Sequence, residues 1–514
     1  MATDTILIID FGGQYCHLIG RRIREMGVYS EIVPYDISKK ELVSMKRNMN
    51  IKGIVLSGGP LSIYYPDSPK MDKKILESGI PILGICYGHQ LLADYIGGRV
   101  EKTPKPEYGN ATARIIKNSR ILKGLKTKEE VWMSHGDSVT ELPKNISIIA
   151  SSTNCRIAAY EDKKKAIFGI QWHPEVVHTK NGSKIFSNFI FEICKCKKEW
   201  NAKKNITQYL NNVKNEIGKG HAIMALSGGI DSTTAAAIAS KAIGDRLTAV
   251  FVDTGLMREG EPQSISEMAK KLDINLVSIN AADKFLAELK NMKDPEAKRK
   301  IIGREFIRVF EEEARKHKAE FLIQGTIYPD RIESGHSKNS SIIKTHHNVG
   351  GIPSDSKFKK IVEPLRDLYK DEVRSLAKNI GIPDEMVYRQ PFPGPGLAVR
   401  IIGEITTEKV KILKKADSIL CSEIEKIPIK ERPWQYFAVL TGIKSTGVKG
   451  DSRAYGDVIA LRAVESKEAM TANFSSIPYE TLEKISGRIT AEIPSVVRVV
   501  YDITNKPPST IEWE

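Results

Sequence analysis

Cysteine is scarce in this sequence: six residues among 514, scattered along the chain. Six cysteines are too few for a disulfide framework at this length, and no pair has the C-x-x-C spacing of a structural zinc site. Apolar runs are short as well, because none approaches the roughly 20 residues that a membrane-spanning helix needs. These absences exclude a disulfide-stapled protein, predict no membrane partner, and favour a reducing, cytoplasmic compartment.

Other features that would define a special class are absent too. The chain has no internal repeat, and its first residues, MATDTILIIDFGG, hold Asp10 within the apolar run and no basic residue before it. They predict a first β-strand rather than a signal peptide. The formal net charge of +15 suggests anionic partners, but the lysines are dispersed without interleaved aromatic residues. We therefore expect no nucleic acid partner.

The chain divides into three regions that differ in their pattern of apolar and polar residues, and together they predict an α/β fold. Residues 1–199 alternate apolar runs such as TILIID and IPILGIC with helical stretches, and residues 200–390 do the same with AIMAL and RLTAVFVD. Strands that alternate with helices predict an open parallel sheet in each of these two domains. The segment ITQYLNNVKNEIG predicts an amphipathic helix. PFPGPGLAVR predicts a loop that opens a small α+β domain at 391–514.

Cys86 stands where a buried strand meets a helix, in the stretch ILGICYGHQLLADY. Glycines lie two residues before and after it, which permits the tight turn of a nucleophile elbow, and the helix N-terminus favours the thiolate. A buried structural cysteine is the alternative interpretation, but it gives no reason for the two glycines. The pattern favours a cysteine nucleophile.

A cysteine nucleophile needs a base, a group that orients the base, and an oxyanion hole. The triplet HPE supplies His173 as the base and Glu175 as the carboxylate that holds it, since residues i and i+2 of an extended chain point the same way. The backbone N–H groups of Gly59, in LSGGP, and of Tyr87 are the candidates for the oxyanion hole.

These motifs resemble those of the class I (triad) glutamine amidotransferases, in which DFGGQY, LSGGP, GICYGHQ and QWHPE occur in this order. The resemblance implies that Cys86 attacks the side-chain amide of glutamine and forms a γ-glutamyl thioester. His173 would then pass the proton to the leaving ammonia, and water would release glutamate. An acceptor for the ammonia is implied elsewhere in the chain.

A second glycine-rich loop, ALSGGIDSTT, joins an apolar run to an alanine-rich helix at 225–234. It lacks the lysine of G-x-x-x-x-G-K-S/T, which reaches the β- and γ-phosphates in the common phosphate-binding loop. Its hydroxyl and N–H groups still suit a tetrahedral anion. Asp231 would repel a phosphate unless a divalent cation lies between them, so we expect Mg²⁺ here. The candidate loop residues are Ser227, Gly228, Gly229, Ile230, Asp231, Ser232 and Thr233.

SGGIDST resembles the signature of the N-type ATP pyrophosphatases. The resemblance implies that the loop binds the β- and γ-phosphates of ATP, which leave together as pyrophosphate, and that adenosine lies beside Val252. Downstream, Asp330 and Glu333 stand one helical turn apart and could share a metal or form a solvated face. Three residues of IIKTHHNVGG suit a lid over the phosphates: Lys344, His346 and His347.

Four further segments, HNVGG, PFPGPGLAVR, STGVKGDSRAYGD and NKPPSTIEWE, resemble the glutamine-hydrolysing GMP synthases. This resemblance covers essentially the full chain and implies that ATP adenylylates XMP and that ammonia then gives GMP and AMP. It also implies a homodimer formed by the last domain. Arginine and lysine suit the phosphate of XMP, and glutamine and glutamate suit its base or sugar. The implied contacts are Arg299, Gln435, Arg498, Lys506 and Glu512.

Two other classes stay open at this point. Another amidating or tRNA-modifying ATP pyrophosphatase would carry a similar loop, although a tRNA-thiolating enzyme is expected to have a cysteine pair near the nucleotide and residues 200–420 contain no cysteine. An inactive protein that binds nucleotides or nucleic acid is the second alternative, although such a protein would be expected to have lost Cys86, His173 or Asp231.

Overall fold

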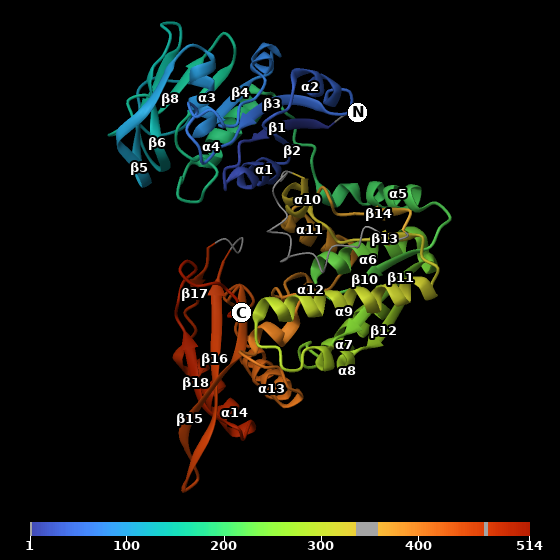
Figure 1. The fold of residues 1–514 in the computed structure, drawn as a ribbon. Coiled ribbons are helices and arrows are strands. Elements are labelled where there is room, and N and C mark those ends of the chain that lie inside the picture. The colour runs from blue at the N-terminus through green and yellow to red at the C-terminus, as the bar shows by residue number, and fades with distance from the viewer. Residues whose placement is uncertain (1–2, 336–357, 467–470) are drawn as a thin grey trace. The chain divides into compact units, whose positions relative to one another are not determined.

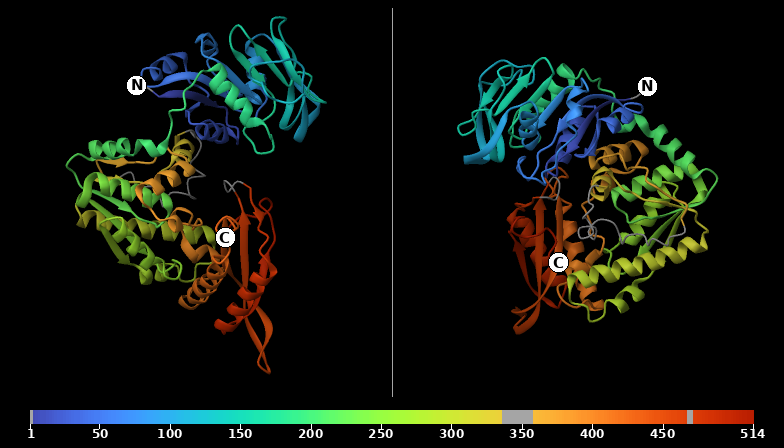
Figure 2. Two further views of the ribbon diagram at one scale, coloured as in Figure 1. Left: turned by 180° about the vertical axis from the view of Figure 1, so that it is seen from behind. Right: turned by 45° about the horizontal axis from the view of Figure 1, so that its top comes forward.

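The computed structural model describes residues 3–335, 358–466 and 471–514. Contacts within the chain divide it into two compact units, residues 1–201 and 202–514, which can be followed in Figures 1 and 2. The domain boundaries predicted at 199 and 390 stay predictions. Among the described residues, no helix combines the length and the apolar character that crossing a membrane requires.

The first unit is built on one nine-stranded sheet with the order β2-β1-β3-β4-β9-β8-β7-β5-β6. Its strands are β1 (Asp4–Asp10), β2 (Tyr29–Pro34), β3 (Asn50–Leu56), β4 (Ile82–Ile85), β5 (Arg99–Ile115), β6 (Lys128–Glu141), β7 (Ser147–Ser151), β8 (Ala159–Asp162) and β9 (Ile167–Ile170). Its α-helices are α1 (Cys16–Glu25), α2 (Lys39–Met45), α3 (Tyr87–Tyr95) and α4 (Gly182–Ser187).

The α/β class predicted for this unit is confirmed, but its sheet is mixed rather than wholly parallel. Strands β2, β1, β3, β4 and β9 pair in parallel, whereas β8, β7, β5 and β6 add antiparallel pairs at one side. The connection between β8 and β9, residues 163–166, is too short for the crossover of a dozen or so residues that a parallel pair requires. Pairing through this connection is therefore antiparallel.

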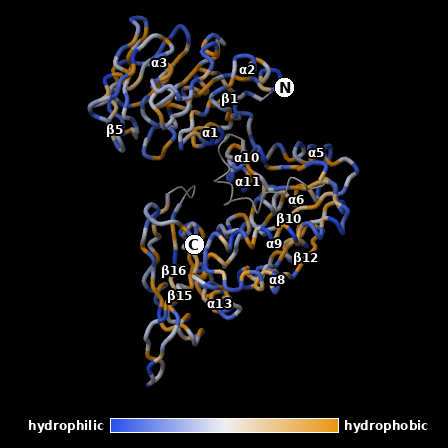
Figure 3. Tube along the Cα trace, in the orientation of Figure 1, coloured by the Kyte–Doolittle hydropathy of each residue, from blue (hydrophilic) through white to orange (hydrophobic). Residues whose placement is uncertain are grey.

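The parallel strands bring the sequence motifs of the first unit to one edge of the sheet. The loops after β1, β3, β4 and β9 contain DFGGQY, LSGGP, Cys86 and QWHPE, respectively. Carboxyl ends of neighbouring parallel strands meet at the same edge, which is where open α/β sheets bind ligands. The strands themselves are buried and hydrophobic, as Figure 3 shows in orange for β1.

The second unit begins with a fully parallel sheet of order β12-β11-β10-β13-β14. The strands are β10 (Ala222–Ala225), β11 (Leu247–Asp253), β12 (Leu276–Asn280), β13 (Phe321–Ile323) and β14 (Lys360–Val362). The α-helices are α5 (Ile206–Ile217), α6 (Ile230–Ile243), α7 (Glu261–Lys271), α8 (Ala282–Glu288), α9 (Pro295–Lys316), α10 (Tyr328–Gly335), α11 (Lys370–Ile380) and α12 (Asp384–Val387). The amphipathic helix predicted after residue 205 is confirmed as α5.

At strand β10, the direction in which the chain adds successive strands to the sheet reverses. The chain leaves β10 toward β11 and later returns to form β13 on its other side. Because parallel crossovers are right-handed, the return from β12 to β13 puts α9 on the face opposite α6 (Figure 1). The loop at 226–229 therefore opens at a topological switch point, where such sheets bind nucleotides.

The last part of the second unit is the predicted α+β segment. It contains α13 (Thr407–Ile424), β15 (Gln435–Lys449), β16 (Ser452–Glu465), β17 (Asn473–Phe474), α14 (Tyr479–Glu492) and β18 (Val496–Asp502). Both views in Figure 2 show the β15–β16 hairpin projecting from this segment. The predicted loop at 391–400 ends in a 3-10 turn, η5 (Gly396–Arg400), all of whose residues are buried. One hydrophobic core runs from β10 and β11 through η5 and α13 to β16, so this segment packs as part of the unit.

Candidate active sites

Cys86 lies on a strained turn between β4 and α3. Its backbone has φ 53° and ψ −106°, in a region that residues with a side chain rarely adopt. The flanking glycines are required by space: a Cβ on Gly84 would lie 2.4 Å from the carbonyl oxygen of Gly88, and one on Gly88 would lie 2.6 Å from the Cβ of Leu56. This crowding makes the elbow, and strain of this kind is typical of functional sites.

His173 and Glu175 meet beside this cysteine. The His173 Nδ1 atom is 2.7 Å from Glu175 Oε1, and the two side chains are 5% and 0% exposed. Because Nδ1 is occupied by the carboxylate, Nε2 is the nitrogen left for Cys86, which is close enough to the imidazole to raise its pKa. The HPE residues lie in the loop after β9 and not in a regular strand, so the contact arises from the turn geometry rather than from extended chain.

The electrostatics of this group favour a protonated imidazole. Burial lowers the pKa of His173, but the negative charge of Glu175 and then that of Cys86 outweigh burial and hold this pKa well above its usual value. An imidazolium next to sulfur stabilises a thiolate, and the thiolate is the nucleophilic form of cysteine.

Residues that the sequence did not single out hold the His173 loop in place. Thr179 Oγ donates a 2.6 Å hydrogen bond to the His173 carbonyl, and the His173 N–H donates to the Trp132 carbonyl at 2.9 Å. The ring of Tyr15, from DFGGQY, meets the imidazole edge-on with the centroids 5.1 Å apart. Arg22 Nε donates to the Glu175 carbonyl at 3.1 Å. Of these residues that hold the loop, only Tyr15 belongs to a motif recognised in the sequence.

The predicted oxyanion donors belong to two loops packed against each other. A Cβ on Gly59 would lie 2.9 Å from the Phe11 carbonyl oxygen and 3.2 Å from the Tyr87 ring. A Cβ on the preceding residue, Gly58, would lie 3.1 Å from the His173 ring. Within the part of the chain that the structure describes, neither the Gly59 nor the Tyr87 N–H donates a hydrogen bond, so both can serve a ligand.

Further polar groups, which belong to none of the sequence motifs, lie near Cys86. Cys86 Sγ is 3.5 Å from the Ser134 carbonyl oxygen, at the start of a short stretch in β6. There, the Asp137 carboxylate accepts from the Tyr64 hydroxyl at 2.9 Å, and Gln90 Nε2 donates to the Asp137 carbonyl at 2.9 Å. These groups could recognise the polar ends of an amino-acid substrate.

The second candidate site is the lysine-free loop before α6. Gly228 has φ 76°, and Gly229 is the N-cap of the 14-residue helix. Ser227 and Ser232 hydroxyls lie 2.9 Å apart across the loop, and Ser232 Oγ donates to the Gly229 carbonyl at 3.0 Å. The loop thus presents hydroxyl groups at a helix N-terminus, which suits an anion.

Asp231 has a cationic neighbour that the sequence did not reveal. Lys370, at the start of α11, forms an ion pair with Asp231 Oδ2. The loop therefore has a lysine after all, supplied from 139 residues further along the chain. Within the described parts of the chain, Asp231 Oδ1 is buried without a hydrogen-bond partner, as are the hydroxyls of Thr233 and Thr326.

These unpartnered oxygens fit a small divalent cation. Mg²⁺ commonly uses one or two carboxylates together with phosphate oxygens and water, so a dedicated protein cage is unnecessary. Among the described residues, no group of three or more histidine, cysteine, aspartate or glutamate side chains forms such a cage. Of the three unpartnered oxygens on described residues, Asp231 Oδ1 is the carboxylate oxygen that could ligate such a cation.

The other residues predicted to contact ATP lie in different surroundings, and some are outside the described part of the structure. The Val252 side chain, near the end of β11, is 4% exposed and belongs to the hydrophobic core. Asp330 Oδ2 accepts from the Ile327 N–H at 3.0 Å in the first turn of α10. Glu333 lies in the same helix, but its side chain is outside the described part of the structure. Lys344, His346 and His347 also lie outside the described residues.

Two of the residues predicted to contact XMP are in direct contact with each other. Gln435, at the start of β15, donates from Nε2 to Glu512 Oε1 at 2.9 Å. Arg400, which was not predicted, donates to both oxygens of Glu512, at 3.0 and 2.9 Å. Arg299, in α9, donates to the backbone carbonyl of Glu514. Through these contacts the two glutamates of the EWE tripeptide at 512–514 bind to residues of α9, η5 and β15.

Arg498 lies apart from this contact, and Lys506 pairs with Ala472. Arg498 is exposed on β18 and stands opposite Val458 of β16, whereas Gln435 stands opposite Val464. Six residues along a strand span roughly 20 Å. Lys506 exchanges backbone hydrogen bonds with Ala472, at 2.7 and 3.1 Å.

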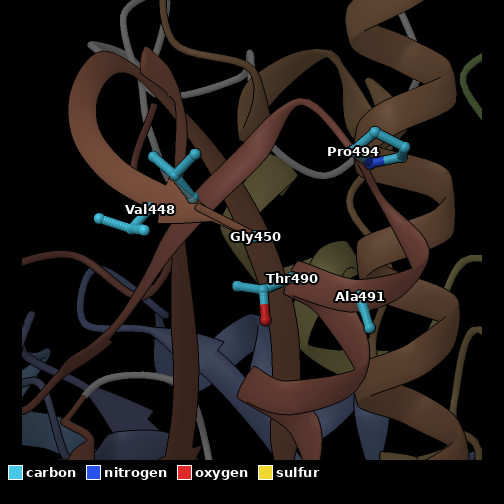
Figure 4. A pocket seen from close by; sticks show the side chains of 6 residues that line it. Val448, Gly450, Thr490, Ala491 and Pro494 are labelled. Atoms are coloured by element: carbon cyan, nitrogen blue, oxygen red, sulfur yellow. The ribbon is translucent and has the colours of Figure 1, made fainter. Parts of the chain in front are cut away.

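A groove near the tip of the β15–β16 hairpin is unsuited to chemistry. It measures about 530 Å³ and is lined by Val448, Gly450, Thr490, Ala491, Pro494 and Val497. Thr490 is the only one of the six with a polar side-chain atom, as Figure 4 shows. None of these six described residues has a side chain that could act as a general acid or base.

Comparisons with known proteins identify the families that the parts of this chain match. The chain matches the family Glutamine amidotransferase class-I over residues 7–193, NAD synthase over 202–319, and GMP synthase C terminal domain over 422–513. Fold and site together define a glutamine amidotransferase joined in one chain to an ATP pyrophosphatase. The structure thus has the class predicted from the motifs.

Relatives that align along the entire chain define the family more closely. The GMP synthase (glutamine-hydrolyzing) of Caldanaerobacter subterraneus subsp. tengcongensis is 52% identical over 99% of both chains. Those of Caldicellulosiruptor saccharolyticus and Clostridium botulinum are 50% and 49% identical over 100% of both chains. The chain belongs to the glutamine-hydrolysing GMP synthase family.

Proposed function

We infer that this enzyme catalyses the ATP-dependent amination of XMP to GMP, with glutamine as the nitrogen donor. One observation carries the inference: a thiol site and a lysine-free phosphate loop occur in a single chain that is 52% identical, over 99% of its length, to a GMP synthase. The first site would generate ammonia and the second would activate its acceptor.

In the first site we assign the nucleophile to Cys86, the proton carrier to His173 and the orienting carboxylate to Glu175. The proposal is supported by the 2.7 Å contact between His173 and Glu175 and by the raised pKa of His173. The thiolate attacks the side-chain carbonyl carbon of glutamine, and His173 Nε2 passes its proton to the departing ammonia. The N–H groups of Gly59 and Tyr87 would stabilise the oxyanion.

In the second site we propose that the loop holds the two phosphates that leave. The C2 oxygen of XMP attacks the α-phosphorus of ATP, and the bond to the β-phosphate breaks to release pyrophosphate. Ammonia then attacks C2 of adenylyl-XMP, and AMP departs with the former C2 oxygen. Adenylation is needed because an oxide-like oxygen is a poor leaving group and an AMP oxygen is a good one.

The loop residues 227–233 and Lys370 would bind the pyrophosphate portion. Lys370 is supported by its ion pair with Asp231, which places a positive charge beside the loop. Asp231 Oδ1 would ligate Mg²⁺, which supplies charge neutralisation between this carboxylate and the phosphates. Val252 would contact adenosine, and Asp330, Glu333, Lys344, His346 and His347 are proposed as metal or lid residues.

For XMP we propose base or sugar contacts by Gln435 and Glu512 and phosphate contacts by Arg299, Arg498 and Lys506. The contact between Gln435 and Glu512 supports a common role for these two side chains. The domain divisions at 199 and 390 are proposed with these assignments. The XMP contacts would then fall mainly in the last domain.

We also propose a homodimer formed through the C-terminal sheet. Five of its apolar side chains are more than 40% exposed: Ile443, Val448, Tyr455, Phe474 and Val500. A second copy of the chain would cover such a surface. Arg498 shares a face of β18 with Val500, so it would lie at an interface that covers Val500. A cytoplasmic location is supported by six free cysteine thiols.

The function can be tested with the purified chain, XMP, Mg²⁺, ATP and either ammonia or glutamine. We expect AMP and pyrophosphate to appear with XMP and one GMP to form for each AMP. Formation of ADP and orthophosphate would refute the adenylation proposal. Nucleotide binding without turnover would identify an inactive binding protein instead.

A further inference from the structure

Buried cations gather around one segment of the second unit. Of the lysine and arginine side chains that the structure describes, three are 0% exposed: Lys298, Arg400 and Arg462. Fully buried lysine and arginine are rare unless they are paired. All three contact residues 502–514, the end of β18 and the segment that follows it. We call residues 503–514 the C-terminal strap.

Each cation holds a different part of the strap. Arg462 binds Asp502, just before the strap, at 3.2 Å, and the carbonyls of Thr510 and Ile511, in the second half of the strap, at 3.1 and 3.4 Å. Arg400 binds the Glu512 carboxylate through two hydrogen bonds, and Lys298 forms an ion pair with the Glu514 side chain. The strap is therefore pinned along its length, and only Arg400 reaches a residue proposed to contact XMP.

Arg400 is itself held rigidly. Its guanidinium carbon lies 4.0 Å from the centroid of the Phe437 ring and 5.3 Å from that of Phe392. A planar guanidinium that stacks on rings and donates two parallel hydrogen bonds fixes both the position and the plane of a carboxylate. Glu512 thereby fixes Gln435, which donates to the same carboxylate at 2.9 Å.

A line of charged contacts leads from Arg400 toward the ATP loop. Arg400 Nη1 is 3.9 Å from Asp417 Oδ1, and Asp417 Oδ2 is 3.0 Å from Arg258 Nε. Arg258 lies after β11, and its backbone N–H donates to Glu261 at 3.1 Å. The other oxygen of Glu261 binds Arg389, which donates to the carbonyl of Gly228 in the phosphate loop at 3.3 Å.

We propose that Arg400 is a positioning residue for the adenylation step. It orients Glu512 and Gln435 toward the purine base and fixes their position relative to the phosphate loop. The proposal rests on the proposed function. Attack of a purine oxygen on the α-phosphorus requires the reacting atoms to be held about 3–3.5 Å apart and in line. Two nucleotides bound by distant parts of one unit need such a connection, and Arg400 is its central member.

The test is Arg400→Lys, which keeps the charge but loses the two parallel donors. Arg462→Lys is the matched control, because it makes the same change at an equally buried arginine that binds the strap without touching Glu512. Both are made in the full chain and measured with ammonia as nitrogen source. We expect Arg400→Lys to lower kcat/KM for XMP on the order of 10- to 100-fold, with the KM for ATP within about threefold of wild type.

A merely structural role would affect both variants alike. If Arg462→Lys lowered kcat/KM for XMP as much as Arg400→Lys, or if Arg400→Lys left it within about threefold of wild type, the inference would be overturned. Glutamine hydrolysis by the first unit and thermal unfolding of each variant report on folding. A wild-type chain without XMP-dependent pyrophosphate release would overturn the proposed function itself.

A double-mutant cycle with Glu512→Gln tests whether Arg400 acts through this carboxylate. If it does, Arg400→Lys has little further effect on kcat/KM for XMP in the Glu512→Gln background. Additive losses would refute the route through Glu512. Should Arg400→Lys not fold, Arg400→Met combined with Glu512→Gln leaves no buried charge unpaired. That double variant should then match Glu512→Gln alone, and a much larger loss would refute the inference.

Discussion

Replacing Glu175 with glutamine removes a charge from the His173 contact while keeping its shape. The carboxylate is 0% exposed and accepts from His173 Nδ1 at 2.7 Å. A hydrogen bond to a charged group contributes about 1.5–3 kcal/mol, and removing the charge of the acceptor costs the imidazolium up to about that amount. We therefore expect glutaminase kcat to fall roughly 10- to 150-fold.

The pH profile gives the sign of the effect independently. Burial lowers the pKa of His173, and the charge of Glu175 is the largest influence that raises it. Without that charge the pKa of His173 falls, so imidazolium is lost earlier as the pH rises. The alkaline limb of the profile of glutamine-dependent activity should move to lower pH.

The control is Glu161→Gln, at a glutamate that is 3% exposed and binds Ser119 in the same unit. We expect this change to leave glutaminase kcat unaltered, and ammonia-dependent GMP formation should persist in both variants. Steady-state glutamate release across pH measures the outcome. An unshifted alkaline limb together with wild-type kcat in Glu175→Gln would falsify the assignment of Glu175 as the group that sustains the imidazolium.

Four further outcomes are expected. Cys86→Ala should abolish GMP formation from glutamine and preserve it with added ammonia; loss of both activities would contradict separable sites. Asp231→Ala should remove both activities, because adenylation precedes either nitrogen source, and retained pyrophosphate release would disprove its role. Gly84→Ala should destabilise the first unit by about 1–3 kcal/mol in chemical denaturation, since its Cβ would lie 2.4 Å from the Gly88 carbonyl oxygen; unchanged stability would show that the elbow relaxes freely. Tyr455→Glu, at a ring that is 73% exposed, should shift the chain toward monomers in analytical ultracentrifugation, whereas an unaltered mass would exclude this surface from the interface.

Much of the fold could be predicted because its central strands are continuous apolar runs. The strands that contain TILIID, AIMAL and RLTAVFVD appear as β1, β10 and β11 in the structure. The antiparallel extension of the first sheet was not predicted. Most residues of β5 are exposed or half-buried, so this strand has no apolar run to mark it, and its pairing depends on neighbours elsewhere in the chain.

The motifs around Cys86 were readable in the sequence for a local reason. An elbow at φ 53° needs glycines at fixed offsets, and a helix that starts at an anion site needs small residues before it, so a few neighbouring positions carry the signal. The chemistry of the thiol and of the lysine-free loop, and through them the family, followed from these short stretches.

The cations that act on those motifs left no comparable signal. Lys370 lies 139 residues from Asp231, and Arg400 lies 112 residues from Glu512. In sequence, each resembles any lysine or arginine of a surface. Local spacing sets a turn, but an ion pair across more than a hundred residues exists only after the strands and helices have packed, because packing alone brings the two charges together.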